Sequence, residues 1–135
     1  MSSQDCIRFA GYAAIFDARD ASGDIIRRGA FAKTLKDRTT GLPLLWQHRP
    51  DTMIGTIDTI DEDLRGLRVI AKLTDTGSWA AAMLVKGIID GLSFGYRARE
   101  FDRKQATREL FEIDLFEVSL VSHPLQHAAR VHLVV

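Results

Sequence analysis

Two segments of the chain repeat their residue types with a period of two, and they constrain the fold more than any other feature. From Leu92 to Ala98, large apolar side chains alternate with small or polar ones, which places Ser93, Gly95 and Arg97 on one face. Successive side chains of a β-strand point to opposite faces of a sheet, so this pattern predicts a strand with one buried face. The segment 109–121 alternates less cleanly and carries apolar residues on both sides. We expect it to be a strand buried on much of both faces, with Leu115, Glu117, Ser119 and Val121 sharing one side.

The rest of the sequence predicts more short strands and two helices. Strands are expected over 7–16, 42–47, 54–60 and 67–73, separated by polar loops or turns at 17–24, 48–51 and 61–66. Short helices are expected over 29–36 and 78–85, with Gly87 as a left-handed cap after the second. Six or so strands with two helices indicate a mainly β (α+β) fold: a closed or nearly closed antiparallel β-barrel flanked by short helices. At 135 residues, the chain is expected to form a single domain over 1–135.

Charge and composition argue against several classes of partner. Eighteen basic and eighteen acidic residues cancel, so no global field attracts nucleic acid or an anionic membrane. No apolar run approaches the length of a membrane span, and the first residues do not resemble an export signal. Cys6, the single cysteine, cannot form an internal disulfide, which favours a reducing cytosol and argues against a cysteine nucleophile. We expect no nucleic-acid partner, no membrane association and no cofactor.

Three side chains could together carry hydrolytic chemistry. His48 follows a predicted strand, Ser93 lies on a strand face beside Gly95, and Glu117 lies inside an otherwise apolar strand. A serine needs a neighbouring base to lose its proton at neutral pH, and a third group must hold the imidazole base in the right tautomer. The sequence supplies all three chemistries.

Each of these residues also has a structural explanation. His48 can be a turn residue, Gly95 can mark a bulge, and Glu117, which is costly to bury alone, can pair with Arg97 in a structural ion pair. His123, His127 and His132 lie close in sequence, but no second cluster of ligands stands beside them, so we expect no metal site. The basic stretch 97–104 is interleaved with acids and indicates a solvated hairpin end.

Five blocks, spread over most of the chain, resemble the HK97-type prohead protease family of tailed bacteriophages. They are Gly11-Tyr12-Ala13-Ala14-Ile15-Phe16-Asp17; Arg28-Gly29-Ala30-Phe31 with Leu35; Leu44-Leu45-Trp46-Gln47-His48 with Ile54-Gly55; Gly91-Leu92-Ser93-Phe94-Gly95-Tyr96; and Phe116-Glu117-Val118-Ser119-Leu120-Val121 with Pro124. The family is related to the herpesvirus assemblins, so the resemblance implies an assemblin-like barrel ringed by helices. It also implies that His48 is the general base, that Ser93 is the nucleophile, and that Glu117 is the third catalytic member.

The resemblance further implies a function in virus assembly. The expected activity is that of a serine endopeptidase, which removes a scaffolding segment from the major capsid protein inside an immature capsid in the bacterial host cytoplasm. The origin would be a tailed phage, a prophage or a gene transfer agent. The portal is a further candidate partner, and dimerisation of the assemblins favours a homodimer. Residues 124–128 depart from the family pattern, so the resemblance does not assign the oxyanion site. The candidates are backbone N–H groups near Ser93 and Arg97 acting through water.

Two other functions stay open at this point. One is a scaffold or capsid-binding assembly module that keeps the barrel without catalytic activity, because a fold alone does not secure a function. The other is a β-barrel domain in which a buried Glu117–Arg97 pair is purely structural.

Overall fold

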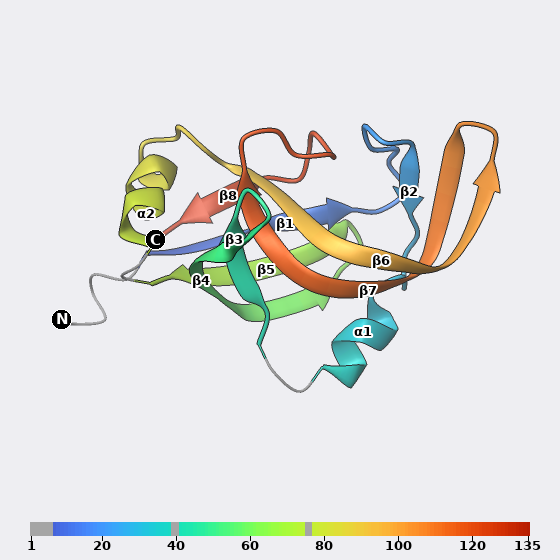
Figure 1. Cartoon of the computed structure of the whole chain (residues 1–135), viewed down its shortest axis with the longest axis horizontal. Helices are drawn as coiled ribbons and strands as arrows, with labels where there is room; N and C mark the ends of the chain where they lie inside the picture. Colours follow the sequence, from blue (N-terminus) through green and yellow to red (C-terminus); the bar gives the residue numbers. More distant parts are fainter. Residues whose placement is uncertain (1–6, 39–40, 75–76) are drawn as a thin grey trace.

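One mixed β-sheet with two short helices makes up the structure (Figure 1). The computed structural model describes residues 7–38, 41–74 and 77–135, so Cys6 lies outside the described residues. The elements in chain order are β1 (Arg8–Ile15), β2 (Asp24–Ile26), α1 (Ala32–Asp37), β3 (Pro43–Trp46), β4 (Arg49–Glu62), β5 (Gly66–Leu73), α2 (Ser78–Val85), β6 (Gly91–Lys104), β7 (Thr107–Val121) and β8 (Val131–Val134). Within these ranges, no helix is long and apolar enough to span a membrane.

Strand β7 organises the sheet, because it is hydrogen-bonded along both of its edges. One edge carries β6, which pairs with it antiparallel from Gly91 opposite Val121 to Lys104 opposite Thr107. The other edge carries β2 near the start of β7 and β3 near its end, and both of these pairings are parallel. From β3 the sheet continues through antiparallel neighbours in the order β4, β5, β1 and β8.

The sheet is not closed, which corrects the expectation of a closed or nearly closed antiparallel β-barrel. Among the residues that the structure describes, strand β8 pairs with β1 and forms no ladder with β6; an isolated bridge joins Gly91 to Arg130, just before β8. The polar segment 122–128 between β7 and β8 contains Pro124, which has no N–H to offer a ladder. The parallel pairings of β2 and β3 with β7 also make the sheet mixed. The mainly β class with short helices is confirmed.

Most elements occur where the sequence predicts them. Helix α2 spans the predicted 78–85, and Gly87 follows it with a positive φ of 73°. Strands β4, β6 and β7 extend further than predicted. Residues 97–104 form the mostly exposed end of the β6–β7 hairpin, as expected from their interleaved charges. Strands β2 and β8 were not predicted. They are 3 and 4 residues long, and each depends on a partner distant in the sequence.

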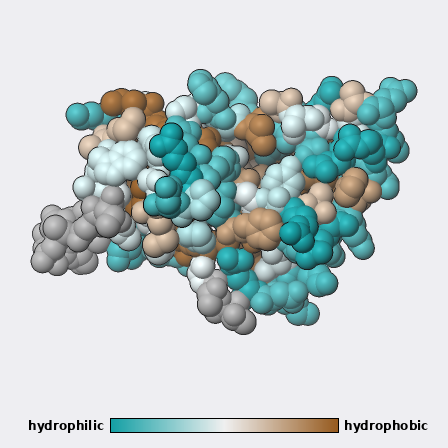
Figure 2. All heavy atoms as spheres, viewed as in Figure 1, coloured by the Kyte–Doolittle hydropathy of each residue, from teal (hydrophilic) through white to brown (hydrophobic). Residues whose placement is uncertain are grey.

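The core lies on the inner side of the curved sheet. Its largest fully buried side chains include Phe9, Phe31, Leu92 and Leu120, and Phe31 meets Phe94 edge to face. Aromatic pairs of this geometry stabilise a core beyond the area that they bury. On the face shown in Figure 2, hydrophilic residues cover the end of the β6–β7 hairpin, and hydrophobic residues gather where α2 ends.

A buried carboxylate fastens β2 to the β6–β7 hairpin. Asp24 is 4% exposed and accepts a bidentate pair of hydrogen bonds from Arg108, at 2.9 and 2.8 Å, and one from the Tyr96 hydroxyl at 2.7 Å. Burial alone would raise the pKa of the Asp24 carboxyl. The hydrogen bonds from Arg108 and Tyr96 outweigh burial and hold this pKa below its ordinary value.

Replacing this carboxylate should destabilise the fold in a pH-dependent way. We expect Asp24→Asn to lower the free energy of unfolding by about 3 kcal/mol at pH 7, because the substitution leaves the Arg108 guanidinium without its charged partner. The folded pKa of Asp24 lies below the unfolded value of about 4. The wild type therefore holds this stabilisation above pH 4 and loses it as the pH falls through the folded pKa, so the gap to Asp24→Asn should narrow in acid.

Urea unfolding at pH 7 and pH 3 measures both effects. Asp58→Asn is a matched control: its carboxylate lies 3.8 Å from the half-exposed Arg8, and we expect a change within about 0.5 kcal/mol. The expectation would be contradicted if Asp24→Asn and Asp58→Asn lowered the free energy of unfolding equally. It would also be contradicted if the difference in that free energy between the wild type and Asp24→Asn stayed constant with pH.

Candidate active site

Four small or polar residues face one another across the β6–β7 ladder. Ser93 is opposite Ser119, and Gly95 is opposite Glu117. Directly opposed residues of an antiparallel pair project from the same face, with Cβ atoms about 5 Å apart. Because Leu92, Phe94, Val118 and Leu120 belong to the core cluster, these four residues lie on the opposite face of the two strands.

A β-bulge at Phe116 turns Glu117 onto that face. The register shifts there, since Gly95 pairs with Glu117 whereas the next residue, Tyr96, pairs with Leu115. Leu115 therefore points into the core, and the prediction that it shares a face with Glu117 is wrong. Phe116 itself is 49% exposed. Bulges commonly occur beside active sites, where they redirect a side chain.

Glu117 has almost no space between its carboxylate and β6, and Gly95 is the reason that it fits. A Cβ atom added at Gly95 would lie 2.5 Å from Glu117 Oε1. The missing side chain is thus what lets the carboxylate lie across the neighbouring strand. Gly95 was considered as the mark of a bulge; in the structure it borders the bulge and also leaves room for Glu117.

His48 reaches this face from the turn that joins β3 to β4. Trp46 pairs with Arg49, so Gln47 and His48 form the turn, with φ values of 49° and 61°. The turn predicted over 48–51 thus begins one residue earlier, and Arg49 already belongs to β4. Two positive φ angles match the type I′ turn that suits a tight hairpin, although residues other than glycine pay about 1–2 kcal/mol each for this conformation.

Strand β7 and Ser122, the residue that follows it, hold the strained turn by four hydrogen bonds. The backbone N–H of Gln47 donates to Leu120 O at 2.9 Å, and that of His48 donates to Ser119 Oγ at 3.1 Å. The Gln47 side chain donates to Ser122 Oγ at 2.6 Å and accepts from the Ser122 N–H at 3.1 Å. These contacts fix the position from which the His48 ring extends.

The imidazole of His48 meets the carboxylate of Glu117. His48 Nδ1 lies 2.5 Å from Glu117 Oε1, and the Ser119 hydroxyl donates to Glu117 Oε2 at 2.6 Å. The His48 side chain is 41% exposed and that of Glu117 is 12% exposed, so the pair joins a solvent-facing ring to a sheltered acid. An Nδ1–H that donates to a carboxylate leaves the lone pair of Nε2 available to accept a proton.

Ser93 lies beside this pair with its hydroxyl uncommitted. Its hydroxyl forms no hydrogen bond to any residue that the structure describes, His48 included. The residue is 4% exposed, yet its oxygen is not among the sealed polar atoms that lack a partner, so solvent reaches it. In unliganded sites, contacts between nucleophile and base are often loose and tighten when the substrate binds.

Arg97 takes no part in an ion pair with Glu117, which excludes the structural pair considered from the sequence. Both oxygens of Glu117 are occupied by His48 and Ser119, and the Arg97 guanidinium lies 6.0 Å from the centre of the Phe116 ring. This distance fits a cation–π contact at an exposed site.

Ser119 is the site residue that the sequence interpretation missed. It was placed on the same strand face as Glu117, but no role was considered for it. The usable signal is the spacing: a serine two residues from a buried acid, on the same face of an apolar strand, needs a hydrogen-bond partner and has one within reach.

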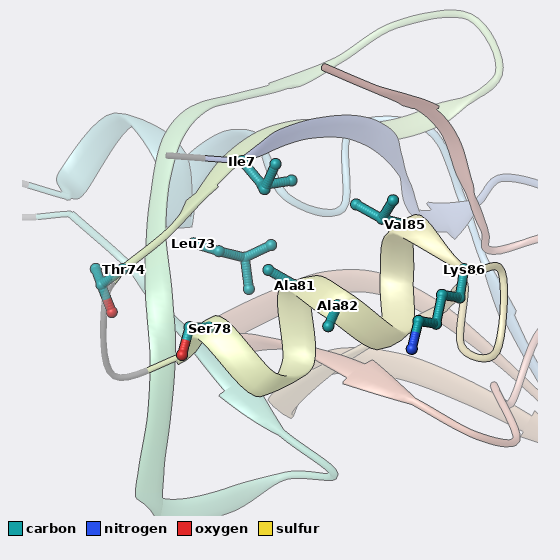
Figure 3. Close-up of a pocket in the computed structure, with 8 residues that line it drawn as sticks. All are labelled: Ile7, Leu73, Thr74, Ser78, Ala81, Ala82, Val85 and Lys86. Carbon is teal, nitrogen blue, oxygen red and sulfur yellow. The ribbon is translucent and has the colours of Figure 1, made fainter. Parts of the chain in front are cut away.

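A hollow elsewhere in the structure has the wrong chemistry for peptide-bond hydrolysis. Its volume is about 380 Å³, and it lies between α2, the end of β5 and Ile7, the residue before β1 (Figure 3). Its lining contains neither an imidazole nor a carboxylate: Ile7, Leu73, Thr74, Ser78, Ala81, Ala82, Val85 and Lys86. In the described ranges, no three His, Cys, Asp or Glu side chains converge in a way that could hold a metal ion.

Known proteins with similar sequences are phage proteins. The prohead protease of Enterobacteria phage HK97 is 35% identical over 98 residues, which are 70% of this chain and 44% of that protein. The capsid polyprotein of Pseudomonas phage PAJU2 is 29% identical over 101 residues, which are 67% of this chain and 15% of that protein. The chain thus spans less than half the length of either relative.

Several solved structures with a similar fold are viral proteases. The bacteriophage T4 capsid assembly protease superposes with a TM-score of 0.70 at 15% identity, over 87% of this chain and 82% of that chain. The varicella-zoster virus protease superposes with a TM-score of 0.65 at 16% identity, over 94% of this chain and 63% of that chain. These likenesses confirm the herpesvirus-protease-like fold. A family model described as caudovirus prohead serine protease matches residues 1–135, and this protein therefore belongs to the caudovirus prohead serine protease family.

Proposed function

We propose that residues 1–135 form one protease domain that cuts peptide bonds with Ser93 as nucleophile, His48 as general base and Glu117 as the acid that orients the base. The observation that carries this proposal is the contact between His48 Nδ1 and Glu117, which lies across Gly95 on the strand face that also presents Ser93. The buried Ser119 is the other serine on this face, and it already donates its proton to Glu117.

The chemistry follows from these positions. Ser93 Oγ attacks the carbonyl carbon of the scissile bond while His48 Nε2 takes the hydroxyl proton, which gives a tetrahedral intermediate. The C–N bond then breaks as the imidazolium returns the proton to the leaving amine, and an acyl-enzyme remains. Water, deprotonated by the same imidazole, releases the acid and restores Ser93. Throughout the reaction, Glu117 accepts a hydrogen bond from His48 Nδ1–H, and its negative charge stabilises the imidazolium.

The substrate that we propose is the major capsid protein, with its scaffolding segment as the part removed. Support comes from the names of the relatives: a prohead protease, a capsid polyprotein and a capsid assembly protease. Prohead maturation places the reaction inside the immature capsid, in the cytoplasm of the bacterial host. A homodimer and contact with the portal are part of the same proposal.

An inactive assembly module is the second candidate. The observation in its favour is that Ser93 and His48 are not hydrogen-bonded to each other in the described structure. Such a module would bind the capsid protein without shortening it.

Substitution of Ser93 separates the two candidates. When the protein is co-expressed with the major capsid protein of the same genome, we expect the wild type to shorten the capsid chain at one site and Ser93→Ala to leave it intact. Intact-mass analysis of the capsid chain is the measurement. Unfolding stability should change by less than about 1 kcal/mol, because one small hydroxyl without a hydrogen bond is removed.

Ser22→Ala is the matched control, because it also removes a single hydroxyl, in the loop before β2, and should keep full processing. Shortening by Ser93→Ala would remove the assignment of the nucleophile. Co-purification without shortening, even by the wild type, would establish the assembly module instead.

A methyl group at Gly95 should uncouple the base from its acid. In Gly95→Ala the new Cβ would lie 2.5 Å from Glu117 Oε1, so the carboxylate must leave the position in which it contacts His48. We expect the rate of capsid-chain shortening to fall about a hundredfold, as misplacement by about 1 Å commonly does. Gly41→Ala is the control, because its nearest neighbour would be Ile57 O at 3.9 Å. Equal rates for Gly95→Ala and the wild type would contradict this geometry.

A further inference from the structure

The second serine on the β6–β7 face is fully buried and bridges two parts of the site. Ser119 is 0% exposed, and its hydroxyl oxygen contacts both the His48 backbone and the Glu117 side chain. No substrate can reach this hydroxyl, so its function must be exerted through the groups that it binds.

The hydrogen-bond roles of Ser119 are fixed by its partners. A hydroxyl has one proton to donate and lone pairs that accept. The N–H of His48 can only donate, at 3.1 Å, and a carboxylate oxygen of Glu117 accepts, at 2.6 Å. The proton of Ser119 therefore points at Glu117 Oε2, which leaves Oε1 directed at the His48 ring.

The Ser119 hydroxyl thus restrains both the backbone of His48 and the carboxylate that contacts the His48 ring. Through the His48 N–H, Ser119 holds the backbone of a turn whose two residues have positive φ angles. Through its hydrogen bond to Glu117 Oε2, Ser119 restrains rotation of the carboxylate about the Cγ–Cδ bond. The Gln47–Ser122 pair also clamps the turn, but it does not touch the carboxylate.

We propose that Ser119 is a positioning residue, which sets the orientation of the His48 imidazole by fixing its backbone and its carboxylate partner together. The inference rests on the proposed function, because it assigns Ser119 a place in that reaction. It acts through His48 and Glu117 and does not touch the substrate. Its removal should therefore lower kcat and leave KM nearly unchanged.

The test compares Ser119→Ala with Ser119→Thr, which restores a hydroxyl at the same position. We expect Ser119→Ala to reduce kcat for shortening of the capsid chain by about tenfold to a hundredfold, and Ser119→Thr to recover most of the loss. Ser22→Ala removes another hydroxyl that donates to a carboxylate two residues away, at 2.7 Å, and should keep the wild-type rate. Thermal unfolding of each variant identifies those that fail to fold.

A second measurement does not depend on cleavage. Nuclear magnetic resonance of the His48 Nδ1 proton, recorded in a Ser93→Ala background, reports directly on the contact with Glu117. With Ser119 in place we expect a protected proton, and in Ser93→Ala/Ser119→Ala we expect exchange with solvent at least about tenfold faster, because the carboxylate is no longer held. This readout would not move if Ser119 only filled space.

The outcomes distinguish this inference from the proposed function. An unchanged Nδ1 exchange rate in Ser93→Ala/Ser119→Ala, or an unchanged kcat in folded Ser119→Ala, would overturn the positioning role while Ser93→Ala could still abolish processing. Persistent processing by Ser93→Ala would instead overturn the assigned nucleophile, whatever the Nδ1 proton shows.

Discussion

A carboxylate that lies within a sheet needs a partner for each oxygen, and this requirement organises the site. Glu117 is buried near the end of β7, and an unpaired charge there would cost several kcal/mol. Its oxygens are directed to the His48 ring and the Ser119 hydroxyl, so the desolvation cost is offset by two polar contacts. The same contacts give the imidazole a fixed tautomer and direction.

The sheet topology brings these groups together. Parallel pairing of β3 with the end of β7 delivers the β3–β4 turn, and with it His48, to the strand that carries Glu117. Antiparallel pairing of β6 with the other edge brings Ser93 and Gly95 to the same stretch. The site is therefore assembled from three neighbouring strands, and the bulge at Phe116 sets which face of β7 the acid occupies.

Local patterns predicted what depends on local physics. Period-two alternation located the paired strands, and helix-tolerant residues before Gly87 located α2. Residue types and strand positions singled out His48, Ser93 and Glu117, and the family resemblance assigned a role to each. The structure brings His48 and Glu117 into contact. Their roles remain proposals.

Long-range pairing was beyond these patterns. Strands β2 and β8 are too short to show a period, and the open sheet follows from where they pair. A turn after the strand predicted over 42–47 was expected, but its start at Gln47 and its positive φ angles were not, because it has no glycine and is stabilised by contacts with β7, distant in sequence. The bulge at Phe116, which reverses the facing of Leu115, likewise depends on the register with β6.

The most direct measurement is covalent labelling of the folded protein with a fluorophosphonate, followed by peptide mass spectrometry to locate the adduct. These reagents react with a serine whose proton is removed by a neighbouring base. If Ser93 is the nucleophile and the pair of His48 and Glu117 activates it, the adduct will be found on Ser93 and will form far more slowly in Glu117→Gln. An adduct on another serine would contradict the assignment of Ser93 as nucleophile. Labelling of Ser93 at the same rate in Glu117→Gln would contradict its activation by His48 and Glu117.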